Sequence, residues 1–159
     1  MSKRSFISNA AAAVGAALGG GLPRPSAEPE TFEINRRDDE WRSILTREQY
    51  AVLRDEHTER AGSSPLDREH RSGTFLCAGC DLPLFTSEAK FDSRTGWPSF
   101  TAPIAGSVRF REDRGFLGTR TEVHCRRCGG HLGHVFDDGP PPTRQRYCMN
   151  GVAMKFEAA

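Results

Sequence analysis

Four of the five cysteines in this 159-residue chain fall into two C-x-x-C pairs, Cys77/Cys80 and Cys125/Cys128. Each pair predicts a tight turn that points two sulfurs at one place. Together the two turns offer the four soft thiolate ligands of a tetrahedral zinc site. The stretch between the pairs is longer than the usual zinc-ribbon spacing, so the turns must belong to hairpins far apart in sequence. One zinc ion would then tie the two ends of a β domain together.

Other uses of the two pairs stay open at this point. In an oxidising compartment each pair could form a disulfide, although a C-x-x-C ring is small and strained unless it is redox-active. A thioredoxin-like redox motif is less favoured, because neither pair follows a βαβ pattern. A zinc hydrolase is weaker still, since four thiolates leave no open position for water or substrate. The pattern favours one structural zinc ion, whose binding contributes on the order of 10 kcal/mol to the folding of small domains.

Composition and pattern predict one globular, mainly β domain. Sixteen Gly and ten Pro favour a turn-rich architecture over a helical bundle, and 36% apolar residues suffice for a core. Short strands and turns begin after Gly73. Alternation of period two predicts a strand at residues 108–111, with a turn at residues 113–115. Residues 119–124 and 152–156 are expected to form further strands.

Two short helices are expected before the strands. Trp41, Ile44 and Leu45 are spaced to line one helix face. Thr46-Arg47-Glu48-Gln49 has the form of a capping box that opens a second helix, which we expect to end at residues 62–65. These helices are predicted to pack on a sheet as a scaffold, without a part in the chemistry.

The N-terminal segment differs from the rest of the chain. Its basic start, Ser2-Lys3-Arg4-Ser5-Phe6-Ile7, resembles a bacterial twin-arginine signal with Lys in place of the first Arg. A weakly apolar run at residues 10–22 and a Pro/Ser/Ala-rich end follow, as in an export signal. That run is too short to cross a bilayer, which needs about 20 residues. We expect residues 1–27 to be removed and residues 28–159 to form one mature domain in the periplasm, without stable membrane insertion. The alternative is an N-terminal tail on a cytoplasmic protein.

Cys148 is left over once zinc has taken the other four cysteines. Such a cysteine is either a buried apolar filler or a nucleophile, and base rates alone favour the filler. The neighbourhood favours the nucleophile, because Arg146 can lower the thiol pKa and Asn150 can orient water or substrate. His131 and His134 could donate protons near neutral pH, although for either one alone a satisfied imidazole is the commoner situation.

The segment Gly96-Trp97-Pro98-Ser99-Phe100 adds an aromatic wall to this set. Trp97 and Phe100 stand on either side of a turn that Pro98 restricts. An aromatic wall of this kind suits an apolar methyl group. The sequence therefore predicts a thiol site with proton donors and an apolar substrate pocket.

These strings together resemble the B-type methionine sulfoxide reductases in their zinc-containing form. The resemblance covers residues 32–156 and includes both C-x-x-C pairs. Its motifs, in order, are Gly96-Trp97-Pro98-Ser99-Phe100, His131-Leu132-Gly133-His134-Val135-Phe136, Asp138-Gly139-Pro140 and Arg146-Tyr147-Cys148-x-Asn150. Each string alone is weak, but the ordered set is highly specific. It implies two antiparallel sheets of the β-tent type with N-terminal helices, and reduction of the R epimer of methionine sulfoxide in oxidised proteins.

The resemblance also implies a role for each site residue. Cys148 would attack the sulfoxide sulfur, His131, His134 and Asn150 would place and protonate the oxygen, Trp97 would pack on the methyl group, and Arg146 would support the thiolate. Methionine leaves and Cys148 remains as a sulfenic acid. An external thiol, such as that of a thioredoxin-like protein, must then reduce it.

Two positions depart from the family pattern. Thr95 stands where many relatives carry a resolving cysteine, just before the Gly-Trp-Pro-Ser-Phe string. If zinc holds four cysteines, no second thiol is free. Gly151 stands where relatives often have Ser, which puts a hydroxyl contact there in doubt.

The rival hypothesis is a zinc-ribbon module that binds protein or RNA without catalysis. It accounts for the four paired cysteines but gives Cys148, the His pair and Trp97 no role. The formal net charge is +1 and no stretch is densely basic, so composition gives nucleic-acid binding no support. We expect no nucleic-acid partner.

Overall fold

The computed structural model describes residues 21–23 and 29–159. Apart from residues 21–23, the expected export signal at residues 1–27 lies outside this described part. Within the described ranges, none of the helices has the length and apolar character that a bilayer crossing requires.

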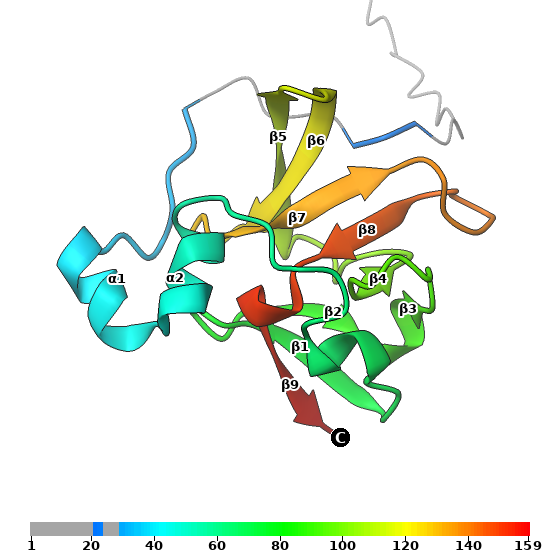
Figure 1. Cartoon of the computed structure of the whole chain (residues 1–159), viewed down its shortest axis with the longest axis horizontal. Helices are drawn as coiled ribbons and strands as arrows, with labels where there is room; N and C mark the ends of the chain where they lie inside the picture. Colours follow the sequence, from blue (N-terminus) through cyan, green and yellow to red (C-terminus); the bar gives the residue numbers. More distant parts are fainter. Residues whose placement is uncertain (1–20, 24–28) are drawn as a thin grey trace, which may run out of the picture.

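Two antiparallel sheets form the body of the structure, as the composition and the resemblance predicted (Figure 1). The smaller sheet has the strand order β2-β1-β9 and the larger has the order β3-β4-β8-β7-β6-β5. The strands are β1 (Gly73–Cys77), β2 (Pro83–Thr86), β3 (Lys90–Phe91), β4 (Ser99–Phe100), β5 (Val108–Gly115), β6 (Gly118–Cys125), β7 (His131–Phe136), β8 (Arg146–Met149) and β9 (Met154–Ala158). The described residues also form three short 3-10 helices: η1 (Pro65–Arg68) before β1, η2 (Ser87–Ala89) between β2 and β3, and η3 (Gly151–Ala153) between β8 and β9.

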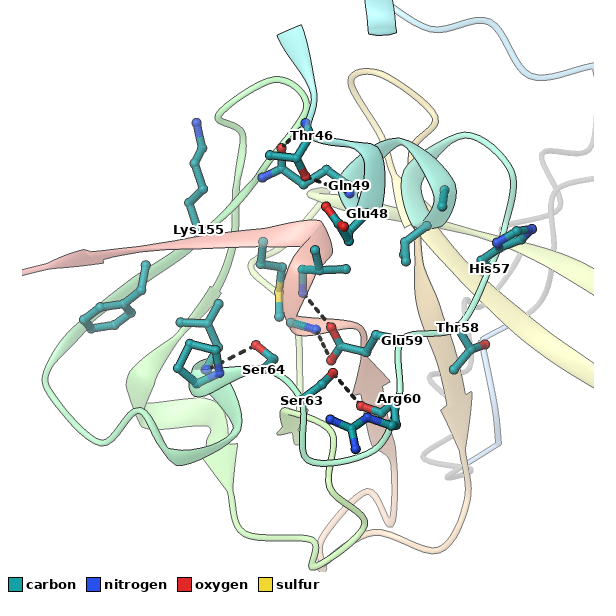
Figure 2. Close-up of a pocket in the computed structure, with 18 residues that line it drawn as sticks. Thr46, Glu48, Gln49, His57, Thr58, Glu59, Arg60, Ser63, Ser64 and Lys155 are labelled. Atoms are coloured by element: carbon teal, nitrogen blue, oxygen red, sulfur yellow. Dashed lines mark hydrogen bonds between the residues drawn. The ribbon is translucent and has the colours of Figure 1, made fainter.

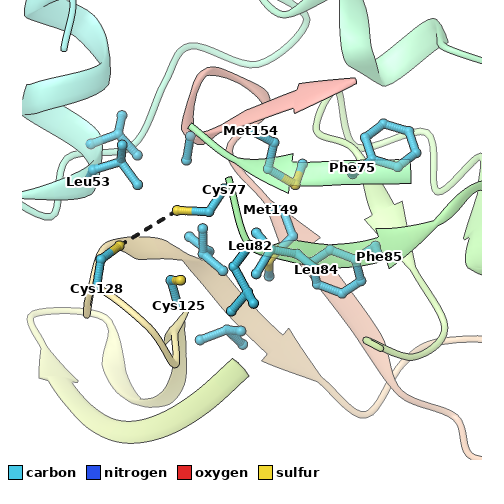
Figure 3. Close-up of a cluster of buried hydrophobic side chains, with 14 of the residues drawn as sticks. Leu53, Phe75, Cys77, Leu82, Leu84, Phe85, Cys125, Cys128, Met149 and Met154 are labelled. Atoms are coloured by element: carbon cyan, nitrogen blue, oxygen red, sulfur yellow. Dashed lines mark hydrogen bonds between the residues drawn. The ribbon is translucent and has the colours of Figure 1, made fainter. Parts of the chain in front are cut away.

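The hydrophobic core lies where the two sheets meet. Phe85 of the smaller sheet stacks on Phe100 of the larger, with ring centroids 4.2 Å apart and planes 18° from parallel. Phe75 meets the same Phe100 ring edge-on at 4.9 Å. Both geometries are favoured between aromatic rings. Figure 3 shows this cluster continuing past Met149 and Leu84 to the cysteines.

The two expected helices are present as α1 (Asp38–Ile44) and α2 (Arg47–Leu53). The capping box of α2 is confirmed: Thr46 Oγ1 accepts from Gln49 N at 3.1 Å, and Gln49 Oε1 accepts from Thr46 N at 3.0 Å. Trp41 and Leu45 are buried as expected, but Ile44 is 53% exposed and that prediction is wrong. The helix also ends earlier than the expected residues 62–65, because Arg54 already closes it with a bond from its N–H to the carbonyl of Tyr50.

The β5–β6 hairpin projects from the body and differs from the expectation at its tip (Figure 1). The turn falls on Phe116 and Leu117, not on residues 113–115. Asp113 stays in the strand because it pairs with Arg120 across the ladder. Gly118, at φ +110°, supplies the left-handed backbone that the turn needs.

Candidate active site and metal centre

The two C-x-x-C pairs fold into matching turns. In each turn the residue after the second cysteine is left-handed, Asp81 at φ 60° and Gly129 at φ 69°. Its N–H donates to the carbonyl of the first cysteine of the pair, Cys77 or Cys125, at 2.9 Å in both cases. Asn, Asp and Gly tolerate this conformation best, so the local sequence favours the turn in both places.

These turns bring the four sulfurs together, within 4.8 Å of one another. Cys77 Sγ lies 3.7 Å from Cys128 Sγ, and Cys80 Sγ lies 3.5 Å from Cys125 Sγ. A tetrahedral zinc ion with bonds of about 2.3 Å requires sulfurs about 3.8 Å apart, so the set fits that metal. The first turn joins β1 to β2 and the second joins β6 to β7, so the cluster links the two sheets as the spacing predicted.

Two arginines adjust the charge around the cluster. Arg127 Nη1 donates to the carbonyl of Cys80 at 3.1 Å, and Arg54 Nη1 donates to the carbonyl of Cys128 at 3.0 Å. Hydrogen bonds to the other three sulfurs, together with burial, raise the pKa of Cys77 well above its usual value. A cation at the centre would allow all four thiols to ionise, and the arginines would offset part of the surplus negative charge.

Cys148 lies on β8 at the edge of a small cavity of about 210 Å³. It stands opposite Ser99 of β4 and opposite His134 of β7, so the three residues share one face of the sheet. The cavity is lined by Thr58, Trp97, Arg120, Gly133, His134, Phe136, Cys148, Met149 and Asn150. The structure thus brings together Cys148, Trp97 and His134, which are far apart in sequence.

The Cys148 thiol is in its neutral form at rest. Burial raises its pKa, and this outweighs the lowering by the nearby Arg146 guanidinium and by a hydrogen bond with Thr95. Arg146 is itself held by Asp138 in a two-pronged ion pair, with N–O distances of 2.8 and 3.0 Å. Arg146 lowers the pKa of the Cys148 thiol, as expected, but burial raises that pKa by more.

His134 is held by a carboxylate that an arginine also binds. Its Nε2 lies 2.8 Å from Asp113 Oδ2, and Arg120 Nη2 donates to the same oxygen at 2.6 Å. Since a carboxylate only accepts, the ring proton lies on Nε2, which leaves Nδ1 as an acceptor. Burial lowers the pKa of His134, although Asp113 opposes this, so the imidazole rests neutral.

His131, at the start of β7, is also held by a carboxylate that an arginine binds. Its Nδ1 lies 2.8 Å from Glu122 Oε1, and Arg111 Nε donates to Glu122 Oε2 at 2.7 Å. Among the described residues, the buried His131 Nε2 atom has no hydrogen-bond partner. The rings of His131 and His134 have centroids 5.4 Å apart. The sequence reasoning missed the two carboxylates, because their contacts depend on the register of the β5–β6–β7 ladder.

Asn150 holds the wall of the cavity through backbone contacts. Its Oδ1 accepts from the N–H of Glu59 at 2.9 Å, and its Nδ2 donates to the carbonyl of Leu132 at 3.0 Å. The carbonyl of the same Glu59 accepts from Trp97 Nε1 at 3.2 Å. The Glu59 carboxylate accepts from the N–H groups of Gly151 and of the residue after it, at 2.8 and 2.9 Å. Glu59 therefore connects two site residues, and no motif in the sequence pointed to it.

Phe100 is a correction to the expected aromatic wall. Its ring is 0% exposed and packs in the core on the far side of the sheet from Cys148. Adjacent strand residues point to opposite faces, so Ser99 faces the cavity and Phe100 cannot. Phe136 takes its place as the second aromatic residue of the cavity, with the Arg146 guanidinium 4.6 Å from its ring centroid.

Gly151 has no room for a side chain, which accounts for one departure from the family pattern. A Cβ on Gly151 would lie 2.0 Å from Ser64 Oγ and 2.4 Å from Ser64 Cβ. A side chain at position 151 would therefore require Ser64 to move.

Comparison with known proteins agrees with this geometry. Residues 45–158 match the SelR domain. The peptide methionine sulfoxide reductase MsrB of Agrobacterium fabrum is 49% identical over 79% of this chain and 93% of its own length. The MsrB proteins of Bradyrhizobium diazoefficiens (49% identical, 84% of this chain and 98% of that one) and Methanosarcina mazei (50%, 78% and 89%) are similar to a comparable degree.

Among solved structures, the Mis18 "Yippee-like" domain gives a TM-score of 0.46 at 20% identity, over 56% of this chain and 98% of that one, a likeness too distant to establish a shared fold. The sequence relationships are decisive, because both the domain match and the relatives cover most of the chain. The chain belongs to the SelR domain family, together with the MsrB peptide methionine sulfoxide reductases.

Proposed function

We propose that the protein reduces the R epimer of methionine sulfoxide in oxidised proteins back to methionine, and so repairs oxidative damage. The observation that carries the proposal is the cavity that Cys148 shares with His134, Trp97 and Phe136. A nucleophile, a proton carrier and two aromatic surfaces for a methyl group meet there. A zinc-ribbon interaction module would leave this arrangement without a purpose.

The reaction follows from the resting protonation states. The neutral Cys148 thiol passes its proton to Nδ1 of the neutral His134, and Asp113 stabilises the resulting imidazolium. The thiolate attacks the sulfoxide sulfur while the imidazolium protonates the oxygen. An S–S bond forms between Cys148 and the substrate, and the protonated oxygen then moves from the substrate sulfur to the Cys148 sulfur as the S–S bond and the original S–O bond break. Cys148 is left as a sulfenic acid and methionine is released, so the thiol is oxidised by two electrons and the sulfoxide is reduced by two.

The remaining site residues support this step. His131, held by Glu122, has an Nε2 atom with no partner among residues 21–23 and 29–159, and its ring lies beside that of His134, where it would stabilise the His134 imidazolium. Asn150 acts as a positioning residue, because its amide holds the Glu59 backbone that in turn holds Trp97. Arg146 would stabilise the thiolate once the substrate has displaced water from the cavity.

We propose that Cys77, Cys80, Cys125 and Cys128 hold one zinc ion with a structural role. The spacing of the sulfurs and their softness support zinc, and four protein ligands leave no position for substrate. When bound, the metal would supply folding energy and no redox chemistry.

An external dithiol must return Cys148 to the thiol state, and a thioredoxin-like protein is the chemical class that fits. We also propose that residues 1–27 are an export signal and that the mature protein works in the bacterial periplasm. The basic start and short apolar run support this. An intact N-terminus on cytoplasmic protein from the native host, seen by mass spectrometry, would refute it.

A turnover assay on separated R and S epimers of a peptide methionine sulfoxide, with dithiothreitol as reductant, tests the proposal. We expect turnover of the R epimer only, and loss of more than about 99% of it in Cys148→Ser, because a hydroxyl is a far weaker nucleophile toward sulfur. Zinc content and the circular dichroism spectrum should stay unchanged in that variant. Equal turnover of both epimers, or an active Cys148→Ser protein, would contradict the proposal.

A further inference from the structure

A groove of about 720 Å³ lies beside the active-site cavity, between α2, residues 57–66, η3 and the start of β9 (Figure 2). Its floor is apolar and includes Val52, Leu66, Val152, Met154 and Phe156. Its volume lies within the range of about 300–1,000 Å³ that is usual for ligand pockets. None of the reaction steps above uses it.

One short segment separates the groove from the active site. Thr58 lines both the groove and the cavity that holds Cys148. Glu59 lines the groove, while its backbone N–H and carbonyl hold Asn150 and Trp97 of the active site. A polypeptide that places one side chain at Cys148 would therefore reach the groove by passing over Thr58 and Glu59.

The chemistry of the groove limits what can occupy it. Its rim carries charges of both signs, with Glu48 and Glu59 against Arg60 and Lys155. Such a rim does not select a strongly charged partner. The Thr46 and Ser63 side chains also line the groove (Figure 2). Thr46 Oγ1 accepts from the N–H of Gln49 and Ser63 Oγ donates to the carbonyl of Arg60, so towards a peptide the Thr46 hydroxyl can still donate and the Ser63 hydroxyl can still accept. An apolar floor with a rim whose acidic and basic side chains balance suits an extended peptide that carries apolar side chains.

Oxidised proteins present peptides of this kind. Methionine is among the residues most often buried, so other apolar residues often lie two positions away from it in a strand, or three or four positions away in a helix. Oxidation to the sulfoxide makes the side chain polar and disrupts the core around it, which exposes those neighbours. We infer that the groove binds apolar side chains close to the methionine sulfoxide in an unfolded polypeptide substrate, an inference that rests on the function proposed above.

The test uses Ala51→Phe, which fills the groove from α2, with Arg47→Phe as the matched control on the same helix outside the groove. Each protein is assayed with dithiothreitol on three R-sulfoxide substrates: N-acetyl-methionine sulfoxide amide, a peptide with Leu residues around the sulfoxide, and the same peptide with Ser. We expect the wild type to prefer the Leu peptide over the Ser peptide by about tenfold in kcat/KM, since one buried Leu side chain contributes that much. Ala51→Phe should remove this preference and leave the small substrate unaffected, whereas Arg47→Phe should keep it.

Several results would overturn the inference. An equal kcat/KM of the wild type for the Leu and Ser peptides would do so, as would an Ala51→Phe protein that loses the same factor on all three substrates. A defect that arises only when thioredoxin replaces dithiothreitol would assign the groove to the reductant, and a change in oligomeric state on gel filtration would assign it to a second copy of the chain. Failure of the wild type on the small R-sulfoxide would instead refute the proposed function itself.

Discussion

The side-chain hydroxyl of Thr95 lies beside the thiol of Cys148 and lowers the pKa of that thiol. Thr95 is fixed there by its neighbours, since its Oγ1 lies 2.8 Å from Ser93 Oγ and accepts from the N–H of Trp97 at 3.4 Å. Ser99, which stands opposite Cys148, completes the network through a 2.7 Å bond to Ser93. The side chain beside the Cys148 sulfur thus carries a hydroxyl group. It belongs to Thr95, at the position where many relatives are expected to have a cysteine.

With a threonine at position 95, we expect the sulfenic acid on Cys148 to be long-lived. The other four cysteines lie in the metal cluster, so oxidised Cys148 has no second thiol to react with. Wild-type protein treated with R-sulfoxide and no reductant should gain one oxygen and form an adduct with dimedone, and its zinc content should not change. The control is Cys148→Ser, which should gain neither. A loss of two hydrogens together with released zinc would mean that a cluster cysteine resolves Cys148.

Thr95→Cys should convert the cycle to an internal disulfide. Because the Thr95 side chain lies close enough to Cys148 to lower its pKa, we expect a thiol at that position to attack the sulfenic acid. After one turnover without reductant, the variant should lose two hydrogens and should not react with dimedone. Thr95→Ser is the matched control and should behave like the wild type. Persistent dimedone labelling of Thr95→Cys would show that the two side chains cannot approach closely enough for a bond.

The alkylation of Cys148 should depend on the Thr95 contact. Burial raises the pKa of Cys148, and the bond from Thr95 lowers it, so Thr95→Val should raise it further. A higher pKa means less thiolate at any given pH, so iodoacetamide should react more slowly near neutrality and its pH profile should move upward. Thr119→Val, at an exposed position on β6, should leave the profile in place. Superimposable profiles for the wild type and Thr95→Val would contradict this prediction.

Glu122 should make stability depend on acid pH. Burial alone would raise the pKa of Glu122, but His131 and Arg111 lower it to about 2. A carboxyl whose pKa is lower in the folded state stabilises the fold above its unfolded value of 4.5, and this contribution disappears as the pH falls toward 2. Glu122→Gln should cost on the order of 2 kcal/mol at about pH 7 in urea unfolding, and the difference from the wild type should shrink toward about pH 3.

The neighbouring Glu112→Gln provides the control for that measurement. Glu112 lies exposed on β5, so its replacement should change the unfolding free energy by less than about 0.5 kcal/mol at either pH. An unfolding difference between Glu122→Gln and the wild type that stays constant between the neutral and the acid measurement would show that the Glu122 carboxylate is not coupled to His131 in the folded state.

Cys125→Ser should abolish metal binding and weaken the whole domain. The four sulfurs lie within one coordination sphere and no other described cysteine can replace a lost ligand. We expect less than about a tenth of the wild-type zinc by elemental analysis and a melting temperature well below that of the wild type, because the binding energy of such a site is folding energy. Cys148→Ser removes a thiol outside the cluster and should keep one zinc per chain. Full occupancy in Cys125→Ser would refute the four-cysteine site.

The cluster of four cysteines could be predicted from sequence, because local strings carry it. A C-x-x-C pair by itself sets the position of two sulfurs, so the fold needed only to bring the Cys77 turn and the Cys125 turn together. The two carboxylates could not be predicted, since Glu122 and Asp113 reach their histidines only through the register of three strands. The expected place of Phe100 in the pocket wall is wrong, because alternation along the strand divides Ser99 and Phe100 between the two faces of the sheet.

The end of α2 is a second feature that the local sequence did not predict correctly. Gly-Ser-Ser-Pro at residues 62–65 is a strong helix terminator, yet α2 had already ended at Leu53. The loop between them supplies Thr58 and Glu59 to the active site, and nothing in its local pattern indicates that role.

The link between the two sheets at the cysteine cluster has a kinetic consequence. A metal ion would be held there by Cys77 and Cys80 from one sheet and by Cys125 and Cys128 from the other, and Cys80 is the half-buried member of the set. Releasing all four thiolates requires the β1–β2 and β6–β7 hairpins to separate. We therefore expect the exchange of an isotopically labelled ion into the protein to become faster under conditions that open these two hairpins locally.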